Sequence, residues 1–392
     1  MTTSTPVEAF RSRLRPGMTV ALGDGAGVPG RLPDGTSVCE ALCSAAAEIG
    51  GIRLVVGWLP EPADGLDAGA FDELIVLMPG AGARPLMRSD TTRFVPARFS
   101  AWPALLTDRL RPQLLITRLV ERAGALHFGS EVSYQRTLVD AGVPVLAVVD
   151  DATPMAAAEA PLNPGQVEII ARSCAGPVSH HREPEPLHDA LADAVLRFIP
   201  AGARIQYGPG QLGTALLRRA TVPLHVDTGL LTDAVVDLDR HGLLCGQPSA
   251  TYLTGTQALY DWADGRPILR GVQHTHDLTR LSRGAPFMAV NTAVEIDHVG
   301  QVNVEGRSDK LIGGIGGHPD FCAAARMHPR GLSIIATPST VNGRSPLVEQ
   351  LSRPVSTPAG DVDLIVTENG YADLREADWT LRRRKIAELF GL

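Results

Sequence analysis

A single glutamate lies inside an apolar stretch of the sequence, where a charged side chain is unusual. Glu295 interrupts the run from Phe287 to Ile296, which has the composition of a β-strand. Burying an unpaired carboxylate costs free energy, so such a residue either lies on a solvent-facing edge of its strand or serves a chemical purpose. A carboxylate is a modest nucleophile, and it becomes an effective one when a water-poor pocket holds it next to the group that it attacks.

A dense run of glycines follows this glutamate and supplies a second chemical capability. The segment "GGIGGHPDF" contains Gly313, Gly314, Gly316 and Gly317, and it begins about twenty residues after Glu295. Backbone N–H groups in such a loop can donate hydrogen bonds to an anion or to an oxyanion that develops during a reaction. The intervening chain is long enough to turn and come back, so we expect the loop to lie beside the carboxylate.

The elements that must position these residues follow from short apolar runs bounded by glycine and proline. The sequence predicts a helix in "SVCEALCSAAAEIG" and strands in "TVALGD", "IRLVVGW", "DELIVLMP", "QLLITRLV", "ALHFGS", "VPVLAVVDD" and "ARIQYGP". The strand segments are rich in Val, Ile and Leu without strict alternation, a pattern typical of strands that are covered on both faces. The predicted fold class is therefore α/β with largely parallel sheets.

The chain resembles itself at two places, which predicts a division into related halves. "RPGMTVALGDGAGVPG" near the start and "IPAGARIQYGPGQLGTALL" from Ile199 each combine a short strand, a glycine-rich turn and a helix. Two such openings predict two structurally related α/β domains, residues 1–185 and 186–392. "SHHREPEP" is interpreted as the linker, and its His180 and His181 as exposed loop residues, because no third metal ligand lies nearby in sequence.

The first glycine-rich turn contains the spacing of a dinucleotide-binding fingerprint, at Gly25, Gly27 and Gly30. That fingerprint requires a helix to begin at the third glycine, so that the pyrophosphate meets the helix N-terminus. In this sequence Ser37, with Glu40 three residues later, is the better helix start. The glycines are therefore expected in an extended loop, and a nicotinamide oxidoreductase is disfavoured.

Composition argues against several other classes of function. The 392-residue chain has a formal net charge of −7, without the basic face that nucleic-acid binding requires. The basic cluster from Arg382 to Lys385 is interpreted as the solvated last turn of a C-terminal helix. No apolar run is long enough to cross a bilayer, and the first residues lack the apolar core of a signal peptide. We expect no nucleic-acid partner and no membrane partner.

The five cysteines are an odd number and widely spaced, which predicts a reducing compartment and hence a cytoplasmic protein. Cys39 and Cys43 lie four apart on a predicted helix, where a core face is favoured over a metal or redox pair. His274 and His276 are two apart and would share one face of a strand, as a surface or core pair. No metal site is predicted.

Several ordered motifs connect the chain to a known family. They are "AVNTAVEIDHVGQVNVE", "GIGGHPDF", "LSIIATPST" and "DLIVTENGYADLR", preceded by "HVDTGLLTDAVVDL" and "TGTQALYDW". In these segments the sequence resembles the acetyl-CoA hydrolase/transferase family, CoA-transferases similar to 4-hydroxybutyrate CoA-transferase. The resemblance extends from about Arg204 to Arg375, and in the first half it rests mainly on "VALGDGAGVPG".

The resemblance implies an activity and a mechanism. It implies two CoA-transferase-like domains, with Glu295 as a nucleophile that attacks an acyl-CoA thioester and passes through a mixed anhydride to a glutamyl-CoA thioester. An incoming carboxylate would then leave as the new acyl-CoA. The implied partners are an acyl-CoA and a small carboxylic acid, with coenzyme A as co-substrate and no tightly bound cofactor. The resemblance also implies a homodimer.

The resemblance also suggests which residues surround the nucleophile. The expected oxyanion and CoA-binding residues are Gly314, Gly316, Gly317, His318, Asn369 and Gly370, and the expected substrate-binding residues are Gly208 and Gly210. His318 stands where family members commonly have Gln. It either replaces the amide as a neutral hydrogen-bonding group, which we favour, or it titrates near neutrality and activates water.

Two alternatives to CoA transfer follow from departures from the family pattern. An acyl-CoA hydrolase would use the same fold and end with water, as an activating His318 would favour. A non-catalytic CoA-binding protein would bind CoA without acyl exchange, a reading motivated by His318 and by the end of the sequence at Leu392, where relatives usually continue. Retention of Glu295 in an intact motif argues against the second alternative.

Overall fold

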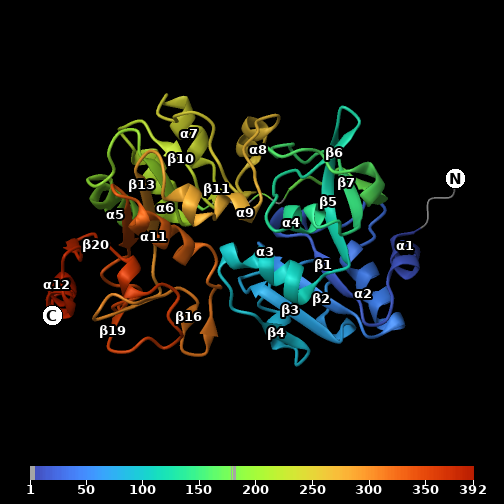
Figure 1. The fold of residues 1–392 in the computed structure, drawn as a ribbon, viewed down its shortest axis with the longest axis horizontal. Helices are drawn as coiled ribbons and strands as arrows, with labels where there is room; N and C mark the ends of the chain where they lie inside the picture. The colour runs from blue at the N-terminus through green and yellow to red at the C-terminus, as the bar shows by residue number, and fades with distance from the viewer. Residues whose placement is uncertain (1–4, 178, 180–181) are drawn as a thin grey trace.

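Two β-sheets, one from each half of the chain, form the frame of the molecule (Figure 1). The computed structural model describes residues 5–177, 179 and 182–392. Helix α1 (Pro6–Arg13) and helix α12 (Trp379–Leu389) lie at opposite ends of the long axis. His180 and His181 of the predicted linker lie outside the described residues.

The first sheet has the strand order β4-β3-β2-β1-β5-β7-β8, and neighbours along this path are parallel. A further strand, β6, pairs antiparallel with β5. The strands are β1 (Thr19–Leu22), β2 (Arg53–Trp58), β3 (Glu73–Met78), β4 (Thr92–Phe94), β5 (Leu114–Arg122), β6 (Ala125–His127), β7 (Val145–Asp150) and β8 (Val167–Ser173). The strands predicted for this half are all present.

The second sheet is also largely parallel and has the strand order β10-β9-β13-β18-β20-β21. Its neighbours are parallel except for β20 and β21. The strands are β9 (Arg204–Tyr207), β10 (His225–Val226), β13 (Phe287–Asn291), β18 (Leu332–Ala336), β20 (Leu364–Thr367) and β21 (Gly370–Asp373). The predicted α/β class with largely parallel sheets is confirmed.

Helices and three smaller strand groups surround these sheets. The remaining helices are α2 (Val38–Ile49), α3 (Trp102–Ala104), α4 (Gln135–Asp140), α5 (Pro186–Leu196), α6 (Gln211–Arg219), α7 (Ala234–Arg240), α8 (Gln257–Ala263), α9 (Val272–Thr275), α10 (Leu278–Leu281) and α11 (His318–Met327). The smaller groups are β11 (Leu230–Leu231) with β12 (Tyr252–Leu253), β14 (Glu295–Asp297) with β15 (Val302–Asn303) and β19 (Leu347–Val348), and β16 (Gly306–Arg307) with β17 (Lys310–Leu311). Among the helices of the described residues, none is long and apolar enough to cross a membrane.

Helix α2 begins where its sequence signal predicts. Ser37 is the N-cap, and its hydroxyl accepts a hydrogen bond from the backbone N–H of Glu40 at 3.2 Å. Gly50 ends the helix with a positive φ of 73°. Cys39 and Cys43 are both buried on this helix, so the predicted core face is confirmed.

The first glycine-rich turn does not form a dinucleotide site. Gly25 to Gly27 form a single 3-10 turn, and the next helix begins only at Val38. The helix that follows therefore does not begin at the third glycine, as a dinucleotide-binding fingerprint requires. The glycines of the turn serve close packing instead, because a Cβ on Gly25 would come within 3.0 Å of the Tyr252 ring.

The two halves share one buried core. A single cluster of buried apolar side chains includes Val55 of the first sheet and Val290 of the second. Backbone pairing also crosses between the halves, as between Glu131 and Tyr252 and between Ala157 and Leu269. The predicted boundary near residue 185 stays a prediction, and the shared core shows that the halves are packed as neighbours rather than joined only by a linker.

The apolar run around Glu295 does not form one continuous strand. Phe287 to Asn291 form β13 in the second sheet, and Glu295 to Asp297 form β14 in a separate three-stranded group. The expectation of a single strand is therefore wrong. The change of sheet carries the glutamate away from the central strand and into hydrogen bonds with side chains from β15 and from the segment after β19.

Candidate functional site

Glu295 is buried and holds several hydrogen bonds. Its side chain is 3% exposed. Oε2 accepts from the backbone N–H of Ser352 at 2.8 Å and from Nδ2 of Asn303 at 2.9 Å. The Ser352 hydroxyl lies 3.0 Å from Oε1 and 2.9 Å from Oε2, and Nε of Arg307 lies 3.3 Å from Oε1. The alternative that Glu295 lies on a solvent-facing edge of its strand is therefore wrong.

These partners keep the buried carboxylate ionised. Burial by itself raises the pKa of Glu295, but the hydrogen bonds from Ser352 and Asn303 and the charge of Arg307 outweigh it, so the pKa lies below its ordinary value. The result is a charged, oriented carboxylate in a protected place. Such a group can attack an electrophilic carbonyl without a prior proton transfer.

The glycine segment lines a cavity between the two halves. The cavity has a volume of about 390 Å³. Gly313, Gly314, Gly316 and Gly317 form one wall, and Gly208, which follows β9, lies on another. Four of the predicted site residues, Gly208, Gly314, Gly316 and Gly317, are thus brought together, and His318 joins them at the start of α11.

Glu295 does not line this cavity, but its hydrogen-bond partner Asn303 is the residue before Val304, which does. The glycine segment is attached to the same stretch of chain, because the backbone N–H groups of Ile312 and Gly313 donate to the carbonyl of Glu305 at 2.8 and 3.1 Å. The short segment from Asn303 to Glu305 therefore connects the carboxylate of Glu295 to the glycine wall.

His318 uses both nitrogens of its ring. Nδ1 lies 2.6 Å from the Thr357 hydroxyl, and Nε2 lies 3.1 Å from the carbonyl oxygen of Thr292. Only a protonated Nε2 can donate to that carbonyl, so Nδ1 accepts from the threonine. Burial lowers the pKa of His318 to about 4. These contacts favour the neutral hydrogen-bonding role over an imidazole that titrates near neutrality.

The remaining predicted site residues lie elsewhere. Asn369 and Gly370 line a different and more open groove of about 810 Å³, together with Tyr371 and Lys385. They are therefore not grouped with the glycine wall, and their oxyanion role stays a prediction. Gly210 lines a cavity of about 280 Å³ that shares Trp58, Pro209 and Leu230 with the main cavity.

A clamp between the halves holds the glycine wall in place. The backbone N–H of Ser100 donates to Oδ2 of Asp320 at 3.0 Å, and its hydroxyl donates to Oδ1 at 2.6 Å. The backbone N–H of Phe99 donates to the carbonyl of Gly316 at 3.1 Å. Burial raises the pKa of Asp320 to about 6, against the lowering effect of the Ser100 hydrogen bonds. Sequence reasoning did not assign Asp320, although it lies in the quoted glycine motif, and Ser100 carries no sequence signal.

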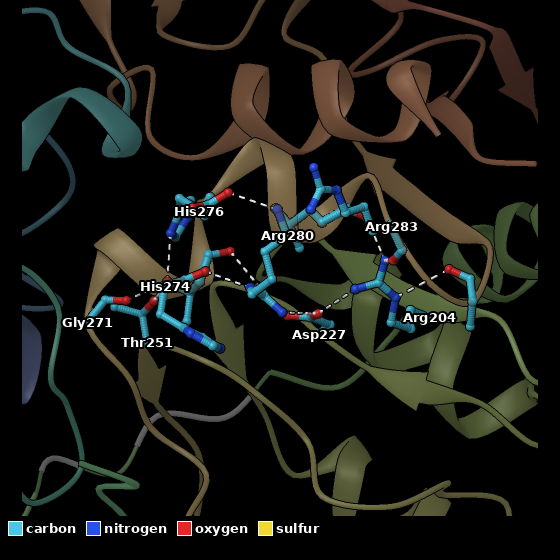
Figure 2. A network of polar contacts seen from close by, with 12 residues as sticks. Arg204, Asp227, Thr251, Gly271, His274, His276, Arg280 and Arg283 are labelled. Atoms are coloured by element: carbon cyan, nitrogen blue, oxygen red, sulfur yellow. Dashed lines mark hydrogen bonds and ion pairs between the residues drawn. The ribbon is translucent and has the colours of Figure 1, made fainter. Parts of the chain in front are cut away.

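His276 forms another wall of the cavity, and a polar network positions it (Figure 2). The expectation of a strand here is wrong, because residues 272–275 form the short helix α9, and His276 is its C-cap. Arg280 anchors this segment: it donates to both carboxylate oxygens of Asp227, at 2.7 and 2.9 Å, and to the carbonyl of His274 at 2.7 Å. His276 is 1% exposed, and burial lowers its pKa to about 3, so the ring is neutral.

The basic cluster near the C-terminus is partly buried. Arg382 is 7% exposed and donates to the carbonyl oxygens of Val299, Ala359 and Leu374. Nζ of Lys385 donates to the carbonyl of Asp373 at 2.7 Å. The interpretation as a solvated turn is therefore wrong for these two side chains, which fasten α12 to the second half.

Metal chemistry has no obvious ligand set in the described part of the chain. Within it, no three or more His, Cys, Asp or Glu side chains are grouped so that they could hold a metal ion.

The fold is the α/β fold of solved CoA-transferase-like proteins. The structure matches RipA from Yersinia pestis with a TM-score of 0.87 at 23% sequence identity, over 98% of this chain and 93% of that one. In sequence, the chain is 26% identical to the 4-hydroxybutyrate coenzyme A transferase of Clostridium kluyveri, over 79% of this chain and 76% of that one. It is 30% identical to an acetyl-CoA hydrolase of Kluyveromyces lactis, over 53% of this chain and 39% of that one.

A match to a protein family covers the region that contains Glu295 and the glycine segment. Residues 255–389 match the acetyl-CoA hydrolase/transferase C-terminal domain. The predicted resemblance to the acetyl-CoA hydrolase/transferase family is confirmed.

Proposed function

We propose that the protein is a CoA-transferase that moves CoA from a short acyl-CoA to a carboxylic acid through a glutamyl-CoA thioester on Glu295. The observation that carries the proposal is the ionised, buried carboxylate of Glu295 held next to the chain segment that bears the glycine wall. An enzyme acting on CoA esters is supported by relatives named as CoA-transferases and acetyl-CoA hydrolases.

The proposed reaction uses two kinds of covalent intermediate. An oxygen of Glu295 attacks the thioester carbonyl, and the C–S bond breaks to give a mixed anhydride and the CoA thiolate. The thiolate attacks the glutamyl carbonyl and releases the first carboxylate, which leaves a glutamyl-CoA thioester. The acceptor carboxylate attacks this thioester, forms a second anhydride and frees the thiolate. The thiolate then takes the new acyl group and restores Glu295.

Each part of the site has a task in this scheme. The glycine wall offers backbone N–H donors for the oxyanion of the tetrahedral intermediates, and loss of one such donor typically costs ~100-fold or more in rate. Oε2 of Glu295 accepts hydrogen bonds from the backbone of Ser352 and from Asn303, so the proposed attacking oxygen is the less strongly held Oε1. Attack requires Oε1 to exchange its contacts with the Ser352 hydroxyl and Arg307 for the thioester.

Hydrolysis is the second candidate, because three relatives are named acetyl-CoA hydrolases. Water would then take the place of the acceptor acid. The contacts of His318 favour transfer, because a ring with both nitrogens engaged and a pKa lowered to about 4 does not serve as a general base for water. The homodimer, the cytoplasmic location and the lack of a tightly bound cofactor stay predictions.

The proposal is tested by mass spectrometry of the protein mixed with a series of acyl-CoAs without an acceptor acid. We expect a CoA adduct on the peptide that contains Glu295, and its absence in Glu295→Ala. Glu349→Ala is the matched control, because Glu349 is exposed and lies on a nearby strand end. Release of free CoA without an adduct would favour the hydrolase, and neither adduct nor release from any acyl-CoA would refute the proposal.

A further inference from the structure

The cavity at the glycine wall has an unusual composition for a site that would receive carboxylic acids. Its apolar walls are built from Trp58, Met78, Phe99, Leu230, Tyr252, Val304, Ile312, Ile315 and Phe321. Among the described residues that line it, none is an Asp, Glu, Lys or Arg. The volume of about 390 Å³ is more than ten times the ~30 Å³ that one water occupies in the liquid, which is room for an acyl chain of several carbons.

The polar side chains in this wall cannot neutralise a charge. Gln206 and Asn291 satisfy each other through two hydrogen bonds of 3.1 Å. The ring nitrogens of His318 are both engaged by protein partners. His276 is buried and neutral, so it carries no positive charge to pair with a carboxylate.

Charged side chains near the cavity already have partners. Nε of Arg98 lies 3.4 Å from Oδ1 of Asp320, and the guanidinium of Arg182, in the adjoining cavity, lies 3.6 Å from Glu185. Asp320, two residues after His318, accepts from the backbone and hydroxyl of Ser100. Arg307 contacts the carboxylate of Glu295. A second carboxylate placed in the cavity would therefore lose its hydration without gaining a cationic partner.

We propose that this cavity receives the acyl chain and selects uncharged acyl groups over those that end in a carboxylate. The inference rests on the proposed function and adds the substrate class: acyl-CoAs of unbranched or branched monocarboxylic acids. Butyryl-CoA and succinyl-CoA form a matched pair for this property, because succinyl carries a carboxylate where butyryl carries its terminal methyl group.

Apolar walls also predict a dependence on chain length. Each methylene group moved from water into such a cavity strengthens binding about three- to four-fold. The preference is therefore expected to rise from acetyl to propionyl to butyryl. For the matched pair, we expect kcat/KM with succinyl-CoA to be at least about 100-fold lower than with butyryl-CoA.

The test measures both binding and turnover. Glu295→Ala keeps the thioester intact, so calorimetric titration of this variant with butyryl-CoA and succinyl-CoA reports binding alone. The wild-type protein is assayed for CoA transfer to acetate with the same two donors. Tighter binding and faster turnover of butyryl-CoA are the expected results.

A positive charge introduced into the cavity lining provides a second test of the proposal. Ile312 lines the cavity and is 45% exposed, so Ile312→Lys can be accommodated without burying the ammonium group. We expect the ratio of kcat/KM with butyryl-CoA to kcat/KM with succinyl-CoA to be at least about ten-fold smaller in this variant than in the wild type. Val341→Lys is the control, because Val341 is 49% exposed and is not among the residues that line the cavity. In this variant the kcat/KM ratio of the two donors should stay at its wild-type value.

The outcomes separate the two proposals. Equal binding and turnover of succinyl-CoA and butyryl-CoA would overturn the inference and leave the CoA-transferase proposal standing. If Ile312→Lys left the kcat/KM ratio of the two donors unchanged, this would also contradict a role of the cavity in selecting the acyl group. If no acyl-CoA gave transfer or an adduct, the proposed function itself would fail, whereas unequal binding to Glu295→Ala would still report the selectivity of the cavity.

Discussion

Asp320 of α11 accepts two hydrogen bonds from one residue of the other half of the chain, the backbone N–H of Ser100 at 3.0 Å and its hydroxyl at 2.6 Å. The pair joins the first turn of α11, which follows the glycine wall, to the loop that carries Phe99. The halves are thus connected at the edge of the cavity, and the position of the glycine donors depends on both of them.

The first prediction concerns the coupling between these two residues. Ser100→Ala and Asp320→Asn should each lower the free energy of unfolding by about 1–3 kcal/mol, because a hydrogen bond to a buried carboxylate is lost. A double-mutant cycle in urea should give a coupling of at least about 1 kcal/mol. Ser282→Ala is the control, since the Ser282 hydroxyl bonds only locally to the carbonyl of Thr279. Additive effects of the two substitutions would contradict the clamp.

The second prediction uses the pH dependence of stability. Burial raises the pKa of Asp320 from 3.8 to about 6, so between these values the native state binds more protons than the unfolded state. Stability from this residue is therefore present at low pH and is lost as the pH rises towards 6. The unfolding free energy of the wild type relative to Asp320→Asn should fall by up to about 3 kcal/mol from pH 4 to pH 7. If the difference in unfolding free energy between the wild type and Asp320→Asn did not change with pH, the pKa of Asp320 would be the same in the folded and unfolded states.

The third prediction concerns His318. Because both ring nitrogens are engaged and the pKa is lowered to about 4, His318→Gln should leave the pH profile of kcat/KM unchanged between about pH 5.5 and 8. The ratio of acyl transfer to hydrolysis should also stay the same. If the wild-type pH profile of kcat/KM had a limb near pH 6.5 and His318→Gln abolished it, His318 would instead be a general base.

The fourth prediction concerns the hydrogen bonds that keep Glu295 ionised. In Ser352→Ala the carboxylate keeps the backbone donor of residue 352 and loses the hydroxyl, so the pKa of Glu295 should rise. The acidic limb of the rate of adduct formation should move to higher pH, and stability should fall by about 1–3 kcal/mol. Thr340 is exposed and lines the groove that contains Asn369 and Gly370. Thr340→Ala should therefore change neither the acidic limb of the rate of adduct formation nor the stability. An unmoved acidic limb in Ser352→Ala would contradict this role.

The fifth prediction compares two glycines of the same wall. A Cβ on Gly317 would come within 2.3 Å of Nε2 of His276, whereas on Gly313 its nearest neighbour would be 3.8 Å away. Gly317→Ala should therefore destabilise the protein by about 1–3 kcal/mol and reduce activity, because His276 is buried and held by its network. Gly313→Ala should change stability by less than about 0.5 kcal/mol. Equal effects in thermal or urea unfolding would show that His276 can move aside.

Much of the fold and part of the site could be predicted from local sequence. Runs of Val, Ile and Leu predicted six of the eight strands of the first sheet and β9 of the second, and Ser37 predicted the start of α2, because these signals act over a few residues. Glu295 and the glycine wall were found because a charge in an apolar run and a cluster of glycines are visible in the sequence. Arg382 was misjudged because a basic cluster looks the same whether it is solvated or bonds buried carbonyl groups.

The sequence by itself determined the fold class, the family motifs and the identity of the candidate nucleophile. The tertiary structure alone decided which donors hold that nucleophile and what closes the cavity. Ser352 lies 57 positions from Glu295, and Ser100 lies 220 positions from Asp320. The physical reason is that periodicity and capping report contacts within one element, whereas a buried carboxylate takes its partners from whichever segments the packing of the two halves brings beside it.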